Sequence, residues 1–158
     1  MTSRIRYTFF ATVFLLTAGW FWFGSMTVRA APVGDSKAAA APVESDMHEF
    51  MEYVFQPTFK RLRPLMGAAP VDNQAWKSIK ADSLILAEGG NLLLIRQPED
   101  DATDWVKHSV QVRDFGGQLY RAAKAKDYPS ARRSYESMVT NCNACHQQFA
   151  GGEHILTP

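Results

Sequence analysis

The chain has 158 residues, of which 46% are hydrophobic and 21% charged, and this suits one modest globular domain. An aromatic content of 12% excludes disorder throughout the chain, and two cysteines are too few for a small domain built on disulfides. The net charge of +1 hides an asymmetry, because Arg4, Arg6 and Arg29 lie in a stretch of 30 residues without an acid. The rest of the chain carries 14 basic and 16 acidic residues, which argues against a nucleic-acid partner.

Residues 1–30 have the pattern of a signal peptide. Arg4 and Arg6 precede an uncharged apolar run of 18 residues, 7–24, and the small residue Ala30 suits a signal peptidase. We therefore expect a cleaved leader and a periplasmic protein. The run also approaches the length of a spanning helix, so an uncleaved anchor is the alternative, and only then is a membrane contact expected. The Ala/Pro-rich residues 31–45 predict a flexible linker.

The remaining residues, 46–158, show helical rather than strand periodicity, in four segments. The first is expected at about 46–65, where Asp46 and Glu49 can form a capping-box pair. Pro57 lies inside this segment and predicts a kink. Its expected apolar face consists of Met47, Phe50, Met51, Val54, Phe55, Phe59 and Leu62.

The other three segments have clear start signals. The second begins at 72–73 with a capping residue and ends before Pro98. Acidic residues 100–101 favour the positive end of a third helix, and Asp127 can cap a fourth that runs to about Phe149. Short connections favour antiparallel neighbours, so we predict an all-α, up-down four-helix bundle. The residues expected inside are Trp76, Ile79, Leu84, Leu86, Leu93 and Leu94, then Trp105, Val112, Phe115, Leu119 and Ala122, then Tyr135, Met138, Val139 and Cys142.

Two glycine pairs, Gly89-Gly90 and Gly116-Gly117, interrupt the second and third segments. Each glycine costs about 1 kcal/mol relative to alanine inside a helix. The glycines either permit close contact between helices or leave space for a bulky group between them. The motif described next favours the second interpretation.

Both cysteines lie in one short motif, Cys142-Asn143-Ala144-Cys145-His146. On a helix, this spacing projects Cys142, Cys145 and His146 from nearly one face. The sequence C-x-x-C-H is typical of covalent haem attachment, in which two thiols add to the haem vinyl groups and the imidazole reaches the iron. Export agrees with this, because bacteria attach c-type haem outside the cytoplasm. We predict one covalent haem c on Cys142 and Cys145, with His146 as proximal iron ligand.

Other uses of the cysteines fit less well. A thioredoxin-like dithiol is expected beside a βαβ pattern, which is missing from the sequence. A structural zinc site needs about four ligands, and His48, His108 and His154 are the only further histidines, each with the pattern of a surface residue. A disulfide between the two cysteines would close a very small loop.

A C-x-x-C-H motif on the last of four helices in an exported chain resembles the class II c-type cytochromes, the cytochrome c′ family. The resemblance covers the chain after the linker. It implies that the residue opposite the proximal histidine comes from the first helix, and that a homodimer forms through outer helix faces. A methionine at that position gives a six-coordinate electron carrier, whereas a bulky non-ligand gives five-coordinate iron that binds small gases such as nitric oxide.

The first segment offers Met47, His48, Met51 and, near its end, Met66. We expect Met51 to be the sixth ligand, with Met47 second and ordinary core packing as the alternative. The prediction is a monohaem cytochrome that exchanges single electrons with partner proteins. It is not expected to be an enzyme, since the sequence shows no nucleophile with a base and an orienting group. The alternatives are a five-coordinate gas-binding protein and a haem-free thiol oxidoreductase.

Overall fold

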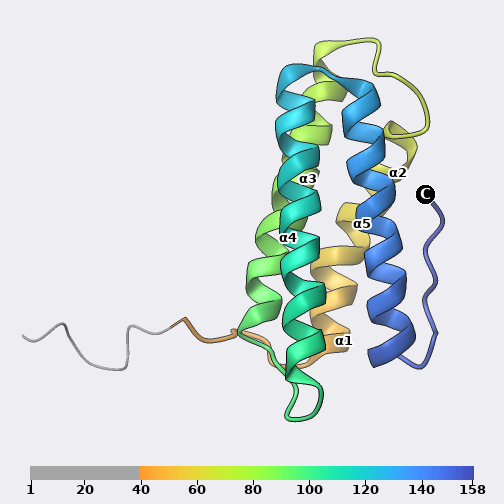
Figure 1. Ribbon diagram of the computed structural model, residues 1–158. Helices are drawn as coiled ribbons and strands as arrows, with labels where there is room; N and C mark the ends of the chain where they lie inside the picture. The colour runs from red at the N-terminus through yellow and green to blue at the C-terminus, as the bar shows by residue number, and fades with distance from the viewer. Residues whose placement is uncertain (1–39) are drawn as a thin grey trace, which may run out of the picture. The chain divides into compact units, whose positions relative to one another are not determined.

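The computed structural model describes residues 40–158, which contain helices and no strand. The elements are α1 (Met47–Phe50), the π-helix η2 (Met51–Phe55), α2 (Gln56–Leu65), α3 (Asn73–Leu94), α4 (Ala102–Ala125) and α5 (Tyr128–Phe149) (Figure 1). Because α1, η2 and α2 follow one another without a break, four helical segments pack together, and the predicted all-α class is confirmed. The predicted signal peptide and most of the predicted linker lie outside the described residues. Among residues 40–158, no helix is long and apolar enough to cross a membrane.

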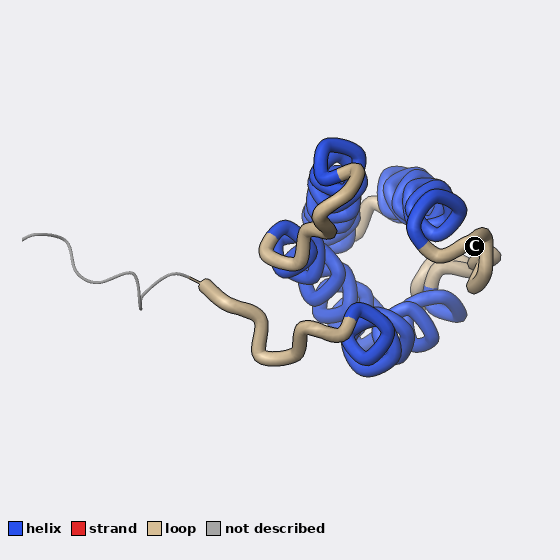
Figure 2. The backbone as a smooth tube through the Cα atoms, turned by 90° about the horizontal axis from the view of Figure 1, so that it is seen from below, coloured by secondary structure: helices blue, strands red, loops and turns tan. Residues whose placement is uncertain are grey.

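The four segments alternate in direction along the bundle (Figure 1). The backbones of α2 and α3, of α3 and α4, and of α4 and α5 lie close together. Within the described part of the chain, α5 makes no such approach to α1, η2 or α2. The view along the bundle shows α5 and the first segment apart, with the C-terminal residues on that side (Figure 2). Three sides of the bundle are thus closed by backbone packing, and the fourth is not.

The predicted helix starts are mostly confirmed. The side chains of Asp46, Asp72 and Asp127 accept hydrogen bonds from backbone N–H groups of the following turns, at 2.7 to 3.2 Å. The predicted capping-box bond from the backbone N–H of Asp46 to the Glu49 side chain is wrong. That N–H donates instead to the carboxylate of Glu44, at 2.7 Å.

The irregularity expected at Pro57 takes the form of the π-helical turn η2. The backbone N–H of Gln56 donates to the carbonyl of Met51, five residues earlier. Gln56 immediately precedes Pro57, which has no N–H to donate. The hydroxyl of Thr58 donates to the Val54 carbonyl at 2.7 Å, so a side chain adds a hydrogen bond where the regular helical pattern is interrupted. The turn changes the face that η2 presents to the bundle, and such turns are frequent at functional sites.

Two apolar clusters form the core. The larger consists of Leu62, Met66, Trp76, Ile79, Leu86, Leu119, Ala123, Ala131, Tyr135, Met138 and Val139, and the smaller of Phe50, Leu93 and Trp105 with partly buried neighbours. One expectation is wrong: Leu84 is 42% exposed. The buried face of α3 follows Ile79, Ser83, Leu86 and Gly90, which turns position 84 outward.

Two of these four glycines, Gly90 and Gly116, permit close helix contact, so the expectation of space for a bulky group is wrong for them. A Cβ on Gly90 would lie 2.6 Å from a backbone nitrogen of α4, and one on Gly116 would lie 2.9 Å from a backbone nitrogen of α3. Gly89 differs, because a Cβ there would lie 2.7 Å from the ring of Phe55. Because Gly89 has no side chain, the Phe55 ring can pack against α3 at this position.

Candidate functional site

A cavity of about 1000 Å³ lies between the first helical segment and α5, on the side where their backbones do not meet. This is at the upper end of the size range of small-molecule and cofactor sites, and the lining is mostly apolar. Its lining includes Met47, Met51, Phe55 and Phe59 on one side, Met138, Cys142, Cys145, His146 and Phe149 on the other, Leu86, Leu93 and Val112 from α3 and α4, and Ile155, Leu156 and Pro158 from the C-terminal residues. The cavity suits a large, largely apolar group.

The predicted site residues come together at this cavity. Cys142, Cys145 and His146 line it from α5, and Met51 lines it from η2. Met47 lines it as well, whereas Met66 is fully buried in the larger core cluster. Helical spacing brings the α5 side chains to one face, and the turn η2 carries Met51 to the opposing wall.

His48 also borders the cavity, but its side chain is 72% exposed and lies 3.4 Å from the carboxylate of Glu52. This agrees with the prediction that His48 is a solvated residue. Among residues 40–158, no three His, Cys, Asp or Glu side chains gather as a metal-binding group.

The two thiols are not activated. Cys142 and Cys145 are free and partly buried. Burial, together with the neighbouring Cys145, raises the pKa of Cys142 to about 12, and burial raises the pKa of Cys145 to about 11. Reactive dithiols have lowered pKa values, whereas burial raises the pKa of both thiols here.

His146 has the protonation pattern of a metal ligand. Its Nδ1 lies 3.0 Å from the backbone carbonyl oxygen of His154, which can only accept, so Nδ1 carries the proton. Burial lowers the pKa of His146, against a smaller opposing effect of this hydrogen bond. The neutral ring therefore keeps a lone pair on Nε2, as metal coordination requires.

The prediction that His108 is a surface residue is wrong. It is 9% exposed, and its Nδ1 lies 2.9 Å from Oδ1 of Asn141, whose amide donates to the His108 carbonyl at 3.0 Å. These bonds join α4 to α5. The signal was present in the sequence, because His108 lies between Trp105 and Val112 on the buried face of α4.

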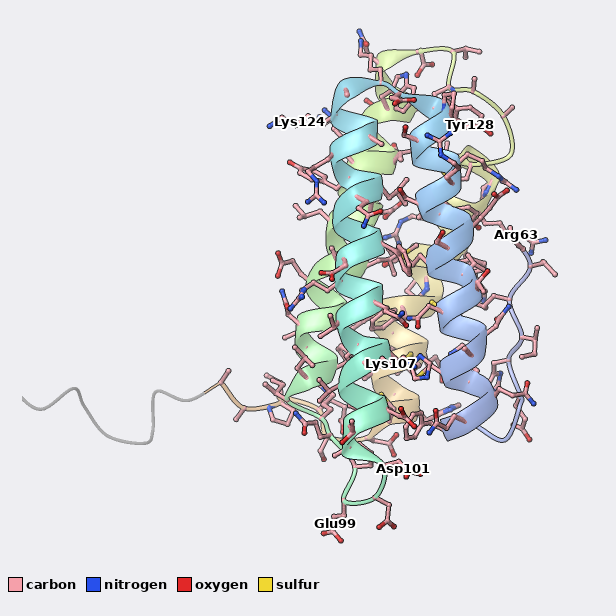
Figure 3. The ribbon with its side chains drawn as sticks, viewed as in Figure 1. Arg63, Glu99, Asp101, Lys107, Lys124 and Tyr128 are labelled. Carbon is pink, nitrogen blue, oxygen red and sulfur yellow. The ribbon has the colours of Figure 1, made fainter. Side chains whose placement is uncertain are left out.

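Arg61 and Arg132 do not line the cavity and have structural roles. Arg61 donates to the buried carboxylate of Asp82 at 2.6 and 3.1 Å, and Arg132 donates to the Met66 carbonyl at 2.7 Å. By contrast, Lys60 and Arg63 line the cavity. Figure 3 shows Arg63 on the side of the bundle along which the C-terminal residues run.

Residues 151–158 have no periodicity, so their path could not be predicted from the sequence. They return along α5 and form part of the cavity wall (Figure 1). The side chain of Asn143 binds both backbone groups of Leu156, at 2.8 and 2.9 Å. A motif residue between the two cysteines thus holds the segment that contacts His146.

Comparison with known proteins gives no relative from which a function can be transferred. No family model, no curated protein and no solved structure matches this chain. The residues of the cavity are therefore the basis for assigning a function.

Proposed function

We propose that this protein is a monohaem c-type cytochrome, similar to the cytochrome c′ family, that carries single electrons. One observation carries the proposal: both cysteines and the histidine of the C-x-x-C-H motif line the same cavity of about 1000 Å³. The cavity is large and mostly apolar, and it has thiols and an imidazole on one wall and a methionine on the other. This donor set fits a haem.

The residues of α5 have defined roles in this proposal. Cys142 and Cys145 would each add an S–H across one vinyl double bond, which forms a C–S bond and moves the hydrogen to the neighbouring carbon without a leaving group or an oxidant. His146 would bind the iron through Nε2, since Nδ1 is engaged with the His154 carbonyl. When bound, the haem supplies a reversible one-electron couple.

Met51 is the proposed sixth ligand. The position of Met51 in η2 supports this assignment. Met51 lines the cavity from the first helical segment, whereas His146 lines it from α5. A thioether ligand opposite an imidazole raises the reduction potential, as in electron-transfer cytochromes c. Phe55 and Phe59 line the same wall and would keep water from the iron.

Lys60 and Arg63 are proposed to stand near the haem carboxylates. They are the Lys and Arg side chains that line the cavity, while its other walls are mostly apolar. A carboxylate that leaves water needs a compensating charge, and these two side chains supply it. The proposal further assigns the protein to the periplasm, after export directed by residues 1–30, and to exchange with redox partner proteins.

Intact mass measurement of the exported chain tests the proposal. The full-length gene is expressed in a host that attaches c-type haem, and the protein is denatured before measurement. We expect the polypeptide mass plus one haem, and loss of that addition in the Cys142→Ser/Cys145→Ser double variant. Ala144→Ser is the matched control, because Ala144 is an exposed residue of the same motif and the substitution introduces the same hydroxyl. A bare polypeptide mass with two titratable thiols would contradict the proposal and support a haem-free protein.

A further inference from the structure

We propose that the C-terminal segment Gly151–Pro158 is a support for the proximal histidine, fixed by Asn143 and acting through the backbone carbonyl of His154. The inference rests on the proposed function of the same site. In this inference, Asn143 and the C-terminal segment position His146, and neither of them contacts the iron.

The chain reverses direction immediately after α5. Gly151 and Gly152 have φ values of +61° and +80°, in the left-handed region, and His154 has φ of +59°. The backbone N–H groups of Ala150 and Gly152 donate to the carbonyl of His146 at 2.9 and 3.1 Å. The reversal therefore begins one turn after the proposed ligand and is hydrogen-bonded to that residue.

The segment is fixed again beyond His154. Asn143 accepts from the N–H of Leu156 at 2.8 Å and donates to its carbonyl at 2.9 Å, and the Leu156 side chain packs against the larger core cluster. His154 thus lies between two hydrogen-bonded anchors, one at Gly152 and one at Leu156. Its carbonyl is held 3.0 Å from Nδ1 of His146 by contacts that do not involve the imidazole.

A carbonyl held in this way has two effects on the histidine. It keeps the proton on Nδ1 and orients the ring, which leaves Nε2 for the iron. It also makes the imidazole a stronger donor, and a stronger donor favours ferric over ferrous iron. The side chain of His154 is 65% exposed and has no part in the bond, which the backbone carbonyl alone accepts.

Two variants of the haem-loaded protein remove the support: Asn143→Ala, and a chain that ends at Gly152. We expect both to keep covalent haem, to lose the slowly exchanging Nδ1 proton of His146 in the diamagnetic ferrous carbon monoxide form, and to have a higher midpoint potential. His154→Asn and Asn91→Ala are the matched controls. The first keeps the backbone in a conformation that asparagine tolerates, and the second makes the same substitution at an exposed site on α3. Both controls are expected to match the unaltered protein.

An unchanged proton resonance and potential in the shortened chain would overturn the inference, even with haem attached. A change in His154→Asn equal to that in the shortened chain would overturn it too, because the imidazole and not the carbonyl would then be responsible. If Asn143→Ala blocks haem attachment, the inference is tested by the chain that ends at Gly152. Absence of covalent haem from the unaltered protein instead contradicts the proposed function, so the two failures are distinguishable by mass.

Discussion

Met51 is the residue on which the choice between electron transfer and gas binding depends. We predict that Met51→Ala keeps covalent haem but loses the low-spin spectrum of methionine ligation. The midpoint potential should fall, within the range of about 0.8 V over which axial ligands set haem potentials. Absorption spectroscopy and redox titration measure both effects.

The control for this variant is Met47→Ala, which removes a methionine that lines the same cavity one turn earlier. It is expected to keep the low-spin spectrum. An unchanged spectrum in Met51→Ala would contradict our ligand assignment. A high-spin ferrous spectrum in the unaltered protein would favour the five-coordinate, gas-binding alternative.

The thiols give the haem-free chain a pH-dependent stability. Burial raises the pKa of Cys142 from 9.0 to about 12 and that of Cys145 to about 11. Unfolded thiols release their protons at lower pH than folded ones, so the free energy of unfolding is highest below pH 9 and falls between 9 and 12. Urea denaturation of haem-free protein should show this fall, and the Cys142→Ala/Cys145→Ala variant should not show it between pH 9 and 10.

Haem attachment should remove the same dependence, because thioethers do not titrate. Burial also raises the pKa of Tyr135 to about 12, so both forms lose stability above its unfolded value of 10.0. A haem-loaded protein whose stability falls between pH 9 and 10 would contradict thioether formation at both cysteines.

At the scale of the helix, α3 and α4 depend on two glycines at their contact. A Cβ on Gly90 or Gly116 would meet backbone atoms of the neighbouring helix at 2.6 and 2.9 Å, which a rotamer change cannot relieve. We predict that Gly90→Ala and Gly116→Ala each lower the free energy of unfolding by about 1–3 kcal/mol, as overpacking does. Urea denaturation of the haem-loaded protein measures the change.

Gly117→Ala is the internal control, because a Cβ there would meet only the side chain of Arg121, at 3.4 Å. It is expected to stabilise the protein by up to about 1 kcal/mol through helix propensity. Equal destabilisation by all three substitutions would show that the contact between α3 and α4 is not what the glycines serve.

The elements whose signals are local could be predicted from the sequence. Asp72 and Asp127 cap their helices as expected, and the spacing of the α5 motif brings its three side chains to one cavity. The roles of the glycines could not be predicted from the sequence. A glycine in a helix can permit contact with a neighbouring helix or leave space for another group, and the position of the neighbouring helix decides which. The role of Asn143 was equally hidden, since its partner Leu156 belongs to a segment without periodicity.

For the molecule as a whole, the signal peptide proposed at residues 1–30 would decide where the protein functions. If residues 1–30 are a cleaved signal peptide, the mature chain begins at Ala31 and is released in the periplasmic fraction. N-terminal sequencing of the exported protein measures this. Ala30→Arg should block cleavage and leave the protein in the membrane fraction, whereas Ala30→Gly should not. A native chain that starts at Met1 in the membrane fraction would instead establish an anchor.

The missing backbone contact between α5 and the first helical segment has a consequence for the order in which the molecule opens. Among the helices of residues 40–158, only α3 lies backbone to backbone with both η2 and α2, whereas α4 is packed between α3 and α5. A region with fewer such contacts opens at a lower free energy than the rest. Amide hydrogens of α2 are therefore expected to exchange with deuterium sooner than those of α4. If haem is attached as proposed, this local opening would let an attaching enzyme reach Cys142 and Cys145 while the other three helices stay folded.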